Sequence, residues 1–206
     1  MTYLIYLMIA AVGYLFGCSN LAYFLAKARG FDIRTYGSSN AGASNATITM
    51  GLKAGVAVAV HDAAKAFLPA LLAALLFPAL PLAGVAAGVS AVLGHIFPFY
   101  LGFRGGKGFA SFMGMILALD WQFFFVILLA AFLITLITDY IVLGTLTTIV
   151  TFPTYLFFFR QMSLVFVGVV CIASLVILCK HLVNLRKIAT GQEIGLRRAL
   201  SKKDRV

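Results

Sequence analysis

The chain has 206 residues, of which 63% are hydrophobic and only 11% are charged. Soluble domains are about half apolar and about a quarter charged, so this composition excludes an ordinary soluble protein. A net charge of +10 could indicate nucleic-acid binding in a soluble chain, but beside long apolar runs it indicates membrane topology and no nucleic-acid partner. We therefore expect residues 1–206 to form a single integral membrane domain.

Seven apolar segments predict an all-α integral membrane protein with about seven transmembrane helices. The first segment has no basic residue before it and is longer than a signal-peptide core, which favours a true span over a cleaved leader. Segment 109–119 is short and would cross only about half of a ~30 Å hydrocarbon core. The segments are expected at 3–26, 54–77, 81–101, 109–119, 121–138, 140–158 and 162–180.

Basic residues give the expected orientation. All but Lys65 and Arg160 flank three regions that fall on one side of a seven-span chain, and the positive-inside rule makes that side cytoplasmic. The N-terminus is then outside, and 181–206 is a basic cytoplasmic C-terminal segment. This pattern predicts a multi-pass membrane protein in contact with membrane lipid. The flanking residues are Lys27, Arg29, Arg34, Lys53, Arg104, Lys107, Lys180, Arg186, Lys187, Arg197, Arg198, Lys202, Lys203 and Arg205.

A first polar island, residues 37–45, reads Gly-Ser-Ser-Asn-Ala-Gly-Ala-Ser-Asn. Such a run can bring backbone N–H groups, hydroxyls and amides close to a small polar ligand, and Ser44 or Asn45 could cap the next helix. A plain flexible loop has the same composition, so the island leaves both interpretations open.

The second island is Arg-Gly-Gly-Lys-Gly at 104–108, directly before the short apolar segment. Glycines beside a helix N-terminus can expose unpaired N–H groups to an anion, and Lys107 adds positive charge there. The spacing is not that of a P-loop, because Leu101 and Gly108 occupy positions that need Gly and Ser or Thr. A hinge with a basic edge is the alternative.

A third island contains His181 and Asn184, which are three residues apart and would share one face of a helix continuing from the last span. His181 could equally be an interfacial residue. Within the second span, Asp62 and Lys65 have the i, i+3 spacing of a pair whose charges offset each other. No His, Cys, Asp or Glu set has metal-ligand spacing, so we expect neither a metal nor a cofactor.

Together, in this order, the islands resemble the bacterial acyl-phosphate:glycerol-3-phosphate acyltransferase family, PlsY, over nearly the whole chain. The stretch from His95 through Gly108 is the most specific part of the resemblance. The other matching positions are Tyr14 to Gly17, Ala26, Lys27, Asp32 to Arg34, Tyr36 to Ser38, Asn40, Gly42, Ala43, Asn45, Gly51, Lys53 to Gly55, Asp62, Lys65, Tyr140, His181, Asn184, Gly191 and Glu193.

The resemblance implies a seven-helix inner-membrane enzyme that moves a fatty acyl group from acyl phosphate to the 1-hydroxyl of glycerol 3-phosphate. Lysophosphatidate and phosphate are the implied products, and no protein partner is required. His181, Asn184 and Lys107 are the implied catalytic residues. The implied substrate- and phosphate-binding residues are Ser38, Asn40, Asn45, Gly105, Gly106, Lys107 and Gly108.

The chain departs from the family pattern at three positions. Ser39 stands where the family usually has Gly, Ile48 where it has Arg, and Val142 where it has Ser. The last two are positions that the resemblance assigns to holding glycerol 3-phosphate. Another basic residue, Arg34 or Lys53, would then have to supply the missing charge.

Two alternatives to this function remain open at this stage. One keeps acyl phosphate as donor and transfers the acyl group to a different, less anionic acceptor. Another is a non-catalytic membrane lipid-binding protein or carrier, with Asp62 and Lys65 lining a path between helices. An acyl-CoA-dependent enzyme is disfavoured, because the positions five after His61, His95 and His181 carry no Asp.

Overall fold

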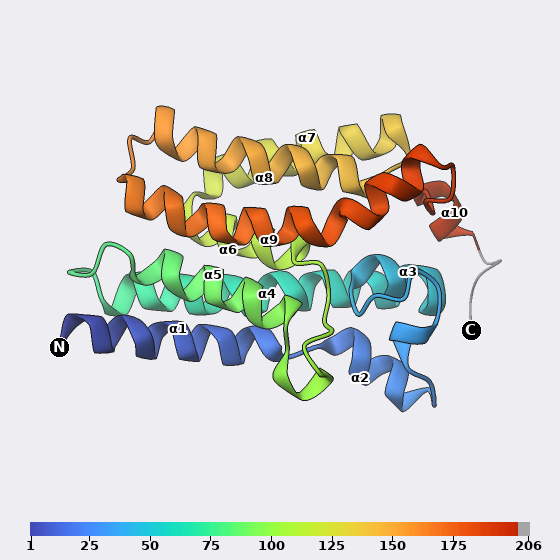
Figure 1. Ribbon diagram of the computed structural model, residues 1–206, viewed down its shortest axis with the longest axis horizontal. Coiled ribbons are helices and arrows are strands. Elements are labelled where there is room, and N and C mark those ends of the chain that lie inside the picture. The colour runs from blue at the N-terminus through green and yellow to red at the C-terminus, as the bar shows by residue number, and fades with distance from the viewer. Residues whose placement is uncertain (202–206) are drawn as a thin grey trace.

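The computed structural model describes residues 1–201 and shows an all-helical protein with its helices along one long axis (Figure 1). Lys202, Lys203 and Arg205 of the expected basic C-terminal segment lie outside the described residues. The helices are α1 (Thr2–Cys18), α2 (Leu21–Ala28), α3 (Ala43–Met50), α4 (Leu52–Leu76), α5 (Ala83–Ile96), α6 (Phe109–Leu119), α7 (Trp121–Thr138), α8 (Ile141–Phe158), α9 (Leu164–Ala189) and α10 (Leu196–Leu200).

Six helical segments of the described chain are long and apolar enough to cross a membrane, so the protein is a multi-pass integral membrane protein. They agree with six of the seven expected segments. The expected short segment is α6, whose bounds are those predicted, and its 11 residues leave it outside that set. The six segments are Thr2–Ala28, Leu52–Leu76, Ala83–Leu101, Trp121–Thr138, Ile141–Phe158 and Leu164–Ala189.

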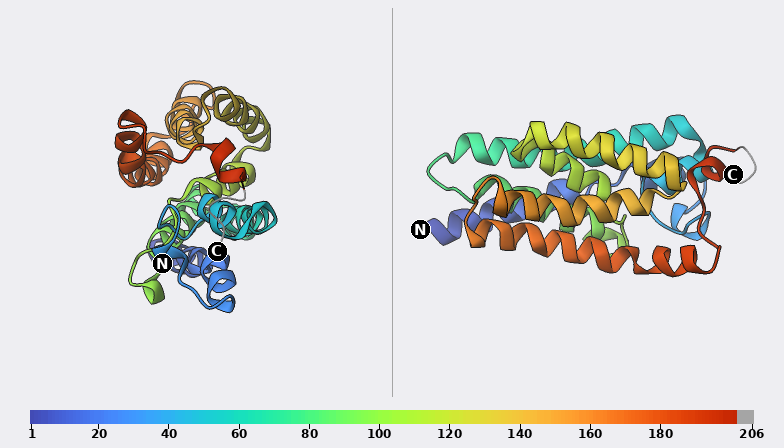
Figure 2. Two further views of the ribbon diagram at one scale, coloured as in Figure 1. Left: turned by 90° about the vertical axis from the view of Figure 1, so that its right-hand side faces the viewer. Right: turned by 90° about the horizontal axis from the view of Figure 1, so that it is seen from above.

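The helices form two groups, which are separate when the molecule is viewed along its axis (Figure 2, left). One group contains α1, α4 and α5, the other α7, α8 and α9, and α6 packs against members of both. The main apolar core lies around α6, where Phe112 meets Phe152 of α8 edge to face. This core fixes α6, and so fixes where the Gly-rich loop before it lies.

Small residues allow α1 and α5 to approach at backbone distance. A Cβ atom at Gly13 or Gly17 of α1 would collide with the carbonyls of Ala87 and Ala91, and one at Gly94 would collide with the Tyr14 carbonyl. Close helix contacts of this kind replace the hydrophobic driving force that is missing inside a membrane. The first span is therefore held mainly by a partner made much later in the chain.

One aspartate and one asparagine shape the ends of these helices. Asp120 ends α6 and caps α7 by accepting a 3.0 Å hydrogen bond from the Phe123 N–H, which explains the near absence of a loop there. Asn20 interrupts the first span between α1 and α2, caps α2 through the Tyr23 N–H, and donates to the Ala41 carbonyl. The last of these bonds ties the first span to the polar loop before α3.

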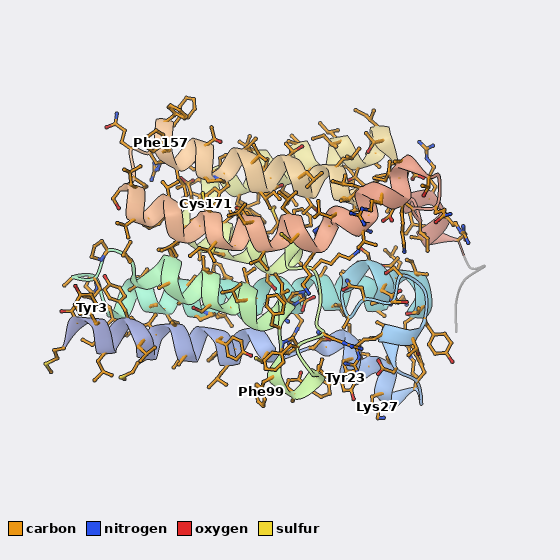
Figure 3. All side chains as sticks on the ribbon, in the orientation of Figure 1. Tyr3, Tyr23, Lys27, Phe99, Phe157 and Cys171 are labelled. Atoms are coloured by element: carbon orange, nitrogen blue, oxygen red, sulfur yellow. The ribbon has the colours of Figure 1, made fainter. Side chains whose placement is uncertain are left out.

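Charged and aromatic residues mark the two ends of the molecule. Figure 3 places Lys27 at the end that also holds α3 and α10, and Tyr3 and Phe157 at the opposite end. Arg160 follows α8 at that opposite end and forms an ion pair of 3.3 Å with Asp120. The three polar islands all belong to the Lys27 end, where the site is found.

Candidate active site

Asn45 organises the first polar island. Its side-chain amide donates to the carbonyls of Ile33 (2.8 Å) and Tyr36 (3.0 Å), and its oxygen accepts the Ser38 N–H at 2.8 Å. The side chain is fully buried and lines neither of the pockets described below. Asn45 thus holds the loop in shape, while Ser38 and Asn40 face open space.

The second island is folded back onto the end of α5. The N–H groups of Gly105 and Gly106 donate to the carbonyls of Ile96 and His95, both at 3.1 Å. The expectation that these two N–H groups are unpaired is therefore wrong. Their lack of side chains serves close packing instead, because a Cβ at Gly106 would collide with the His95 imidazole.

Free N–H groups do occur one turn later, at the start of α6. Gly108 has a left-handed φ of +97° and turns the chain into the helix at Phe109. The first N–H groups of any α-helix have no intrahelical partner, and those of Phe109 and Ala110 border the first pocket described below. A helix N-terminus beside a lysine ammonium group is an arrangement that can bind an anion, so the predicted anion site stays a prediction, with these N–H groups in place of those of Gly105 and Gly106.

Lys107 is linked across the molecule to α9. Its Nζ donates a 2.6 Å hydrogen bond to Oδ1 of Asn184, and Nδ2 of Asn184 donates a 2.6 Å bond to Oε1 of Glu193. Burial lowers the pKa of Lys107 below the usual lysine value, and the charge of Lys187 lowers it further, whereas Glu193 acts in the opposite direction. The ammonium group of Lys107 is therefore half-buried and is fixed in place by Asn184.

His181 lies one turn before Asn184 on α9, in the helix that was expected to continue from the last span, and both side chains are buried. Nδ1 of His181 lies 2.8 Å from the carbonyl of Ile177. Because a carbonyl can only accept, Nδ1 carries the proton, and Nε2 of the neutral ring keeps a lone pair. The ring borders the first pocket and can there accept a proton from a ligand hydroxyl.

Two pockets meet at this end of the bundle. The first pocket, about 430 Å³, lies among α3, the start of α6, α8, α9 and α10. The second pocket, about 470 Å³, lies among the loop at 32–40, the loop at 104–107 and α9. The residues that line both are Ser38, Asn40, Lys107, Asn184 and Lys187.

The second pocket is strongly basic. Besides the shared lysines, it is bordered by Arg34, Arg104 and Lys180. Arg34 is already engaged, because it forms a 2.7 Å ion pair with Asp32 and donates to the Leu101 carbonyl. Its hydrogen bonds hold the pKa of Asp32 below the usual range.

Ile48 and Val142, the two departures from the family pattern, both line the first pocket. Lys53, one of the two residues considered as a replacement cation, borders neither pocket, and Arg34 borders only the second. The first pocket instead receives Arg198 from α10, a residue that was expected from the sequence only as part of the basic cytoplasmic segment. Lys187 was also missed, although it lies three residues after Asn184 and therefore on the same helical face.

A buried polar cluster supports the site from inside the membrane segments. Asp62 and Lys65 form the expected ion pair at 2.8 Å, and both are almost fully buried. Nδ1 of His95 lies 3.4 Å from the same Asp62 carboxylate. Since His95 also packs on Gly106, the cluster connects α4 with the Gly-rich loop.

Fold and pockets together define an all-helical integral membrane protein with a polar, basic site at one end of its helices. The family described as "Glycerol-3-phosphate acyltransferase" matches residues 7–191. The glycerol-3-phosphate acyltransferase of Thermoanaerobacter pseudethanolicus is 35% identical over 188 residues, covering 91% of this chain and 93% of the relative. That of Geobacter sulfurreducens is also 35% identical, covering 91% and 95%.

Solved structures give the same result. The crystal structure of PlsY, an integral membrane glycerol 3-phosphate acyltransferase, in its glycerol 3-phosphate form has a TM-score of 0.87 and 30% identity to this chain. It covers 93% of this chain and 95% of its own. The lysophosphatidic acid form gives a TM-score of 0.84, with 95% and 98% covered. The chain belongs to the glycerol-3-phosphate acyltransferase family and is an acyltransferase of the PlsY type, an enzyme class of phospholipid synthesis.

Proposed function

We propose that this enzyme transfers a fatty acyl group from acyl phosphate to the 1-hydroxyl of glycerol 3-phosphate, producing lysophosphatidate and inorganic phosphate. The observation that carries this proposal is the pair of pockets that share Lys107. A reaction between two phosphate-bearing substrates needs two anion sites with a common boundary, so that the reacting atoms meet. Relatives with this fold have been solved with glycerol 3-phosphate and with lysophosphatidic acid.

The second pocket is assigned to the donor phosphate. Its arginines and lysines suit an anion, and Ser38 supplies a hydroxyl group. Val183, which borders it, is 58% exposed on the surface of α9, so a lipid-borne acyl chain can reach this pocket from the bilayer. Gly105 and Gly106 shape this pocket by close packing rather than through their N–H groups.

The first pocket is assigned to the acceptor. His181 and Asn184 border it from α9, and the N-terminus of α6 faces it. The acceptor hydroxyl oxygen attacks the acyl carbonyl carbon, the bond from that carbon to the phosphate oxygen breaks, and phosphate leaves. The hydroxyl proton passes to Nε2 of His181 or to the departing phosphate, while Lys107 stabilises the negative charge on the leaving group.

We also propose that the pocket end faces the cytoplasm and that α6 is part of a seventh crossing. The start of α1 and the last described helix, α10, lie at opposite ends of the long axis, which requires an odd number of crossings between them (Figure 1). The basic loops lie at the pocket end, in agreement with the positive-inside rule. A thiol introduced at exposed Lys53 should react with a membrane-impermeant reagent in inverted but not in right-side-out vesicles, and the opposite pattern would reverse the orientation.

The activity is tested with purified protein and palmitoyl phosphate, by measuring phosphate release with and without glycerol 3-phosphate. Release that depends on glycerol 3-phosphate, falls strongly in Lys107→Ala and persists in Lys53→Ala supports the proposal. Lys53 is the matched control because it is an exposed lysine outside both pockets. Absence of acceptor-dependent release from a folded sample would reject it.

A second candidate is acyl transfer to a less anionic alcohol. The observation in its favour is the pair Ile48 and Val142, which makes part of the first pocket apolar. This candidate predicts that neutral polyols stimulate phosphate release and that glycerol 3-phosphate does not saturate the enzyme.

A further inference from the structure

The first pocket has a shortage of positive charge of its own. Among its described lining residues, the lysine and arginine side chains are Lys107, Lys187 and Arg198, and both lysines also line the second pocket. The pocket further contains the acidic Glu193. If two phosphates are bound side by side, Lys107 and Lys187 lie between them. Of these three described cations, Arg198 is the one that lines the first pocket and not the second.

Arg198 is brought to the pocket by a defined docking of α10. The N–H of Leu196 donates to the Asp139 carbonyl at 2.7 Å, and the N–H of Arg197 donates to Oδ1 of Asp139 at 2.9 Å. On its other side α10 contacts α3, the helix that carries Ile48. Figure 2 (left), which looks at this end of the bundle, shows the short red helix between the α7–α8 pair and α3.

The match to the family model ends at residue 191, before α10 begins at Leu196. Two features meet in the first pocket: the arginine expected at position 48 is an isoleucine, and an arginine reaches the same pocket from α10. A guanidinium group suits this task, because its planar set of donors can bind two phosphate oxygens at once.

We propose that Arg198 binds the phosphate of glycerol 3-phosphate in the first pocket, replacing the charge that is absent at Ile48. The proposal rests on the proposed function and adds a specificity-determining residue to it. It assigns α10 the role of a wall of the acceptor site. In this arrangement the phosphate of glycerol 3-phosphate lies between Arg198 and the N-terminus of α6. The 1-hydroxyl of the same molecule points towards His181.

The test compares Arg198→Ala with Arg197→Ala. Arg197 is the matched control because it is an exposed neighbour on the same helix that borders neither pocket. We expect Arg198→Ala to raise the KM for glycerol 3-phosphate roughly five- to tenfold, a moderate effect because the side chain is exposed. The KM for palmitoyl phosphate should not change, and Arg197→Ala should alter neither value by more than about twofold.

A gain-of-function variant separates binding from folding. Adding Ile48→Arg to Arg198→Ala returns a guanidinium to the first pocket from α3, so the KM for glycerol 3-phosphate should recover. If Arg198 only stabilised α10, an arginine at position 48 would not restore the KM for glycerol 3-phosphate. An elevated KM that Ile48→Arg leaves unchanged, in a double variant with the wild-type melting temperature, would count against the proposal.

Calorimetric titration with glycerol 3-phosphate makes the result independent of turnover. Weaker binding by Arg198→Ala than by Arg197→Ala supports the proposal. If both variants bind and turn over glycerol 3-phosphate like the wild type, the role of Arg198 is rejected while the proposed function stands. If the wild-type protein neither binds nor acylates glycerol 3-phosphate, both are rejected.

Discussion

Lys107 and Asn184 are 77 positions apart in the chain, and a 2.6 Å hydrogen bond joins the ammonium of one to the amide oxygen of the other. This bond connects the Gly-rich loop before α6 with the last long helix. Both residues border both pockets, so the bond lies where the two proposed substrates meet. It fixes the position of the one lysine that the mechanism uses on the leaving group.

Removing the amide should therefore release Lys107. We expect Asn184→Ala to lower kcat/KM about ten- to hundredfold, because a hydrogen bond to a charged group typically contributes about 1.5–3 kcal/mol. Leu182→Ala on the same helix, at a partly exposed apolar position, is the control and should retain most of the activity. Equal activity of the two variants in the phosphate-release assay would show that Lys107 needs no tether.

The pH dependence of activity should report the environment of Lys107. Only the protonated amine binds phosphate, and burial lowers the pKa of this lysine, so activity should fall on the alkaline side at a lower pH than for an ordinary lysine. Lys187→Gln removes a charge that lowers the pKa and should move the alkaline limb to higher pH. Glu193→Gln removes the opposing charge and should move it to lower pH.

These two shifts are measured as midpoints of the kcat/KM profile rather than as maximal rates, since both residues line the first pocket. Gln at position 193 can still accept the hydrogen bond from Asn184, which isolates the effect of charge. Midpoints that move in the same direction in the two variants would contradict the assignment to Lys107.

Gly106 should not tolerate a side chain. Its Cβ would meet the His95 imidazole, and overpacking of a buried site typically costs about 1–3 kcal/mol. We expect Gly106→Ala to lower both the melting temperature in detergent and the rate, because the Gly-rich loop must move away from α5. Gly168→Ala is the matched control, since nothing lies near a Cβ there, and it should be neutral or slightly stabilising.

The ion pair of Asp62 with Lys65 should show strong coupling. Either Asp62→Asn or Lys65→Met leaves one buried charge without its partner, which typically costs about 3–5 kcal/mol. The double variant removes both charges and should be much less destabilised than the sum of the singles. A double-mutant cycle on thermal stability measures this coupling, and additive effects would show that the two charges are independently stabilised.

Ser39 has a backbone φ of +56°, a left-handed conformation that costs a residue with a side chain about 1–2 kcal/mol. Glycine avoids that cost, but it lowers the free energy of unfolding by roughly 0.5–1 kcal/mol because the unfolded chain has more conformational freedom at a glycine. Ser39→Gly should therefore stabilise the protein slightly, by about 0.5–1 kcal/mol, without lowering activity. A lower melting temperature of Ser39→Gly would contradict this expectation and show that the Ser39 hydroxyl makes a stabilising contact that glycine loses.

The parts of the fold that depend on local patterns could be predicted from the sequence. The bounds of α6 follow from Gly108 and Asp120 on either side of an apolar run, and the shared face of His181 and Asn184 follows from helical periodicity. The pairing of Asp62 with Lys65 follows from the cost of an isolated charge in an apolar span.

The remaining features depend on contacts between distant elements. The commitment of the Gly105 and Gly106 N–H groups to carbonyls of α5 depends on how the loop folds back, which no local pattern encodes. The role of Asn45 likewise depends on distant partners. Its side chain holds the loop through the carbonyls of Ile33 and Tyr36, and the sequence around Asn45 does not encode those contacts. Arg198 reaches the first pocket because Asp139 anchors α10, a relationship across the end of the bundle.

The glycine contacts between α1 and α5 also set an order of assembly during synthesis. The carbonyls of Ala87 and Ala91, which meet Gly13 and Gly17 respectively, belong to a helix that leaves the ribosome only after all of α4 has been made. Until α5 is made, the glycine face of α1 that contains Gly13 and Gly17 is exposed to lipid. A break in the chain after α4 would therefore leave an N-terminal fragment that inserts into the membrane but lacks the partner that holds its first helix in place.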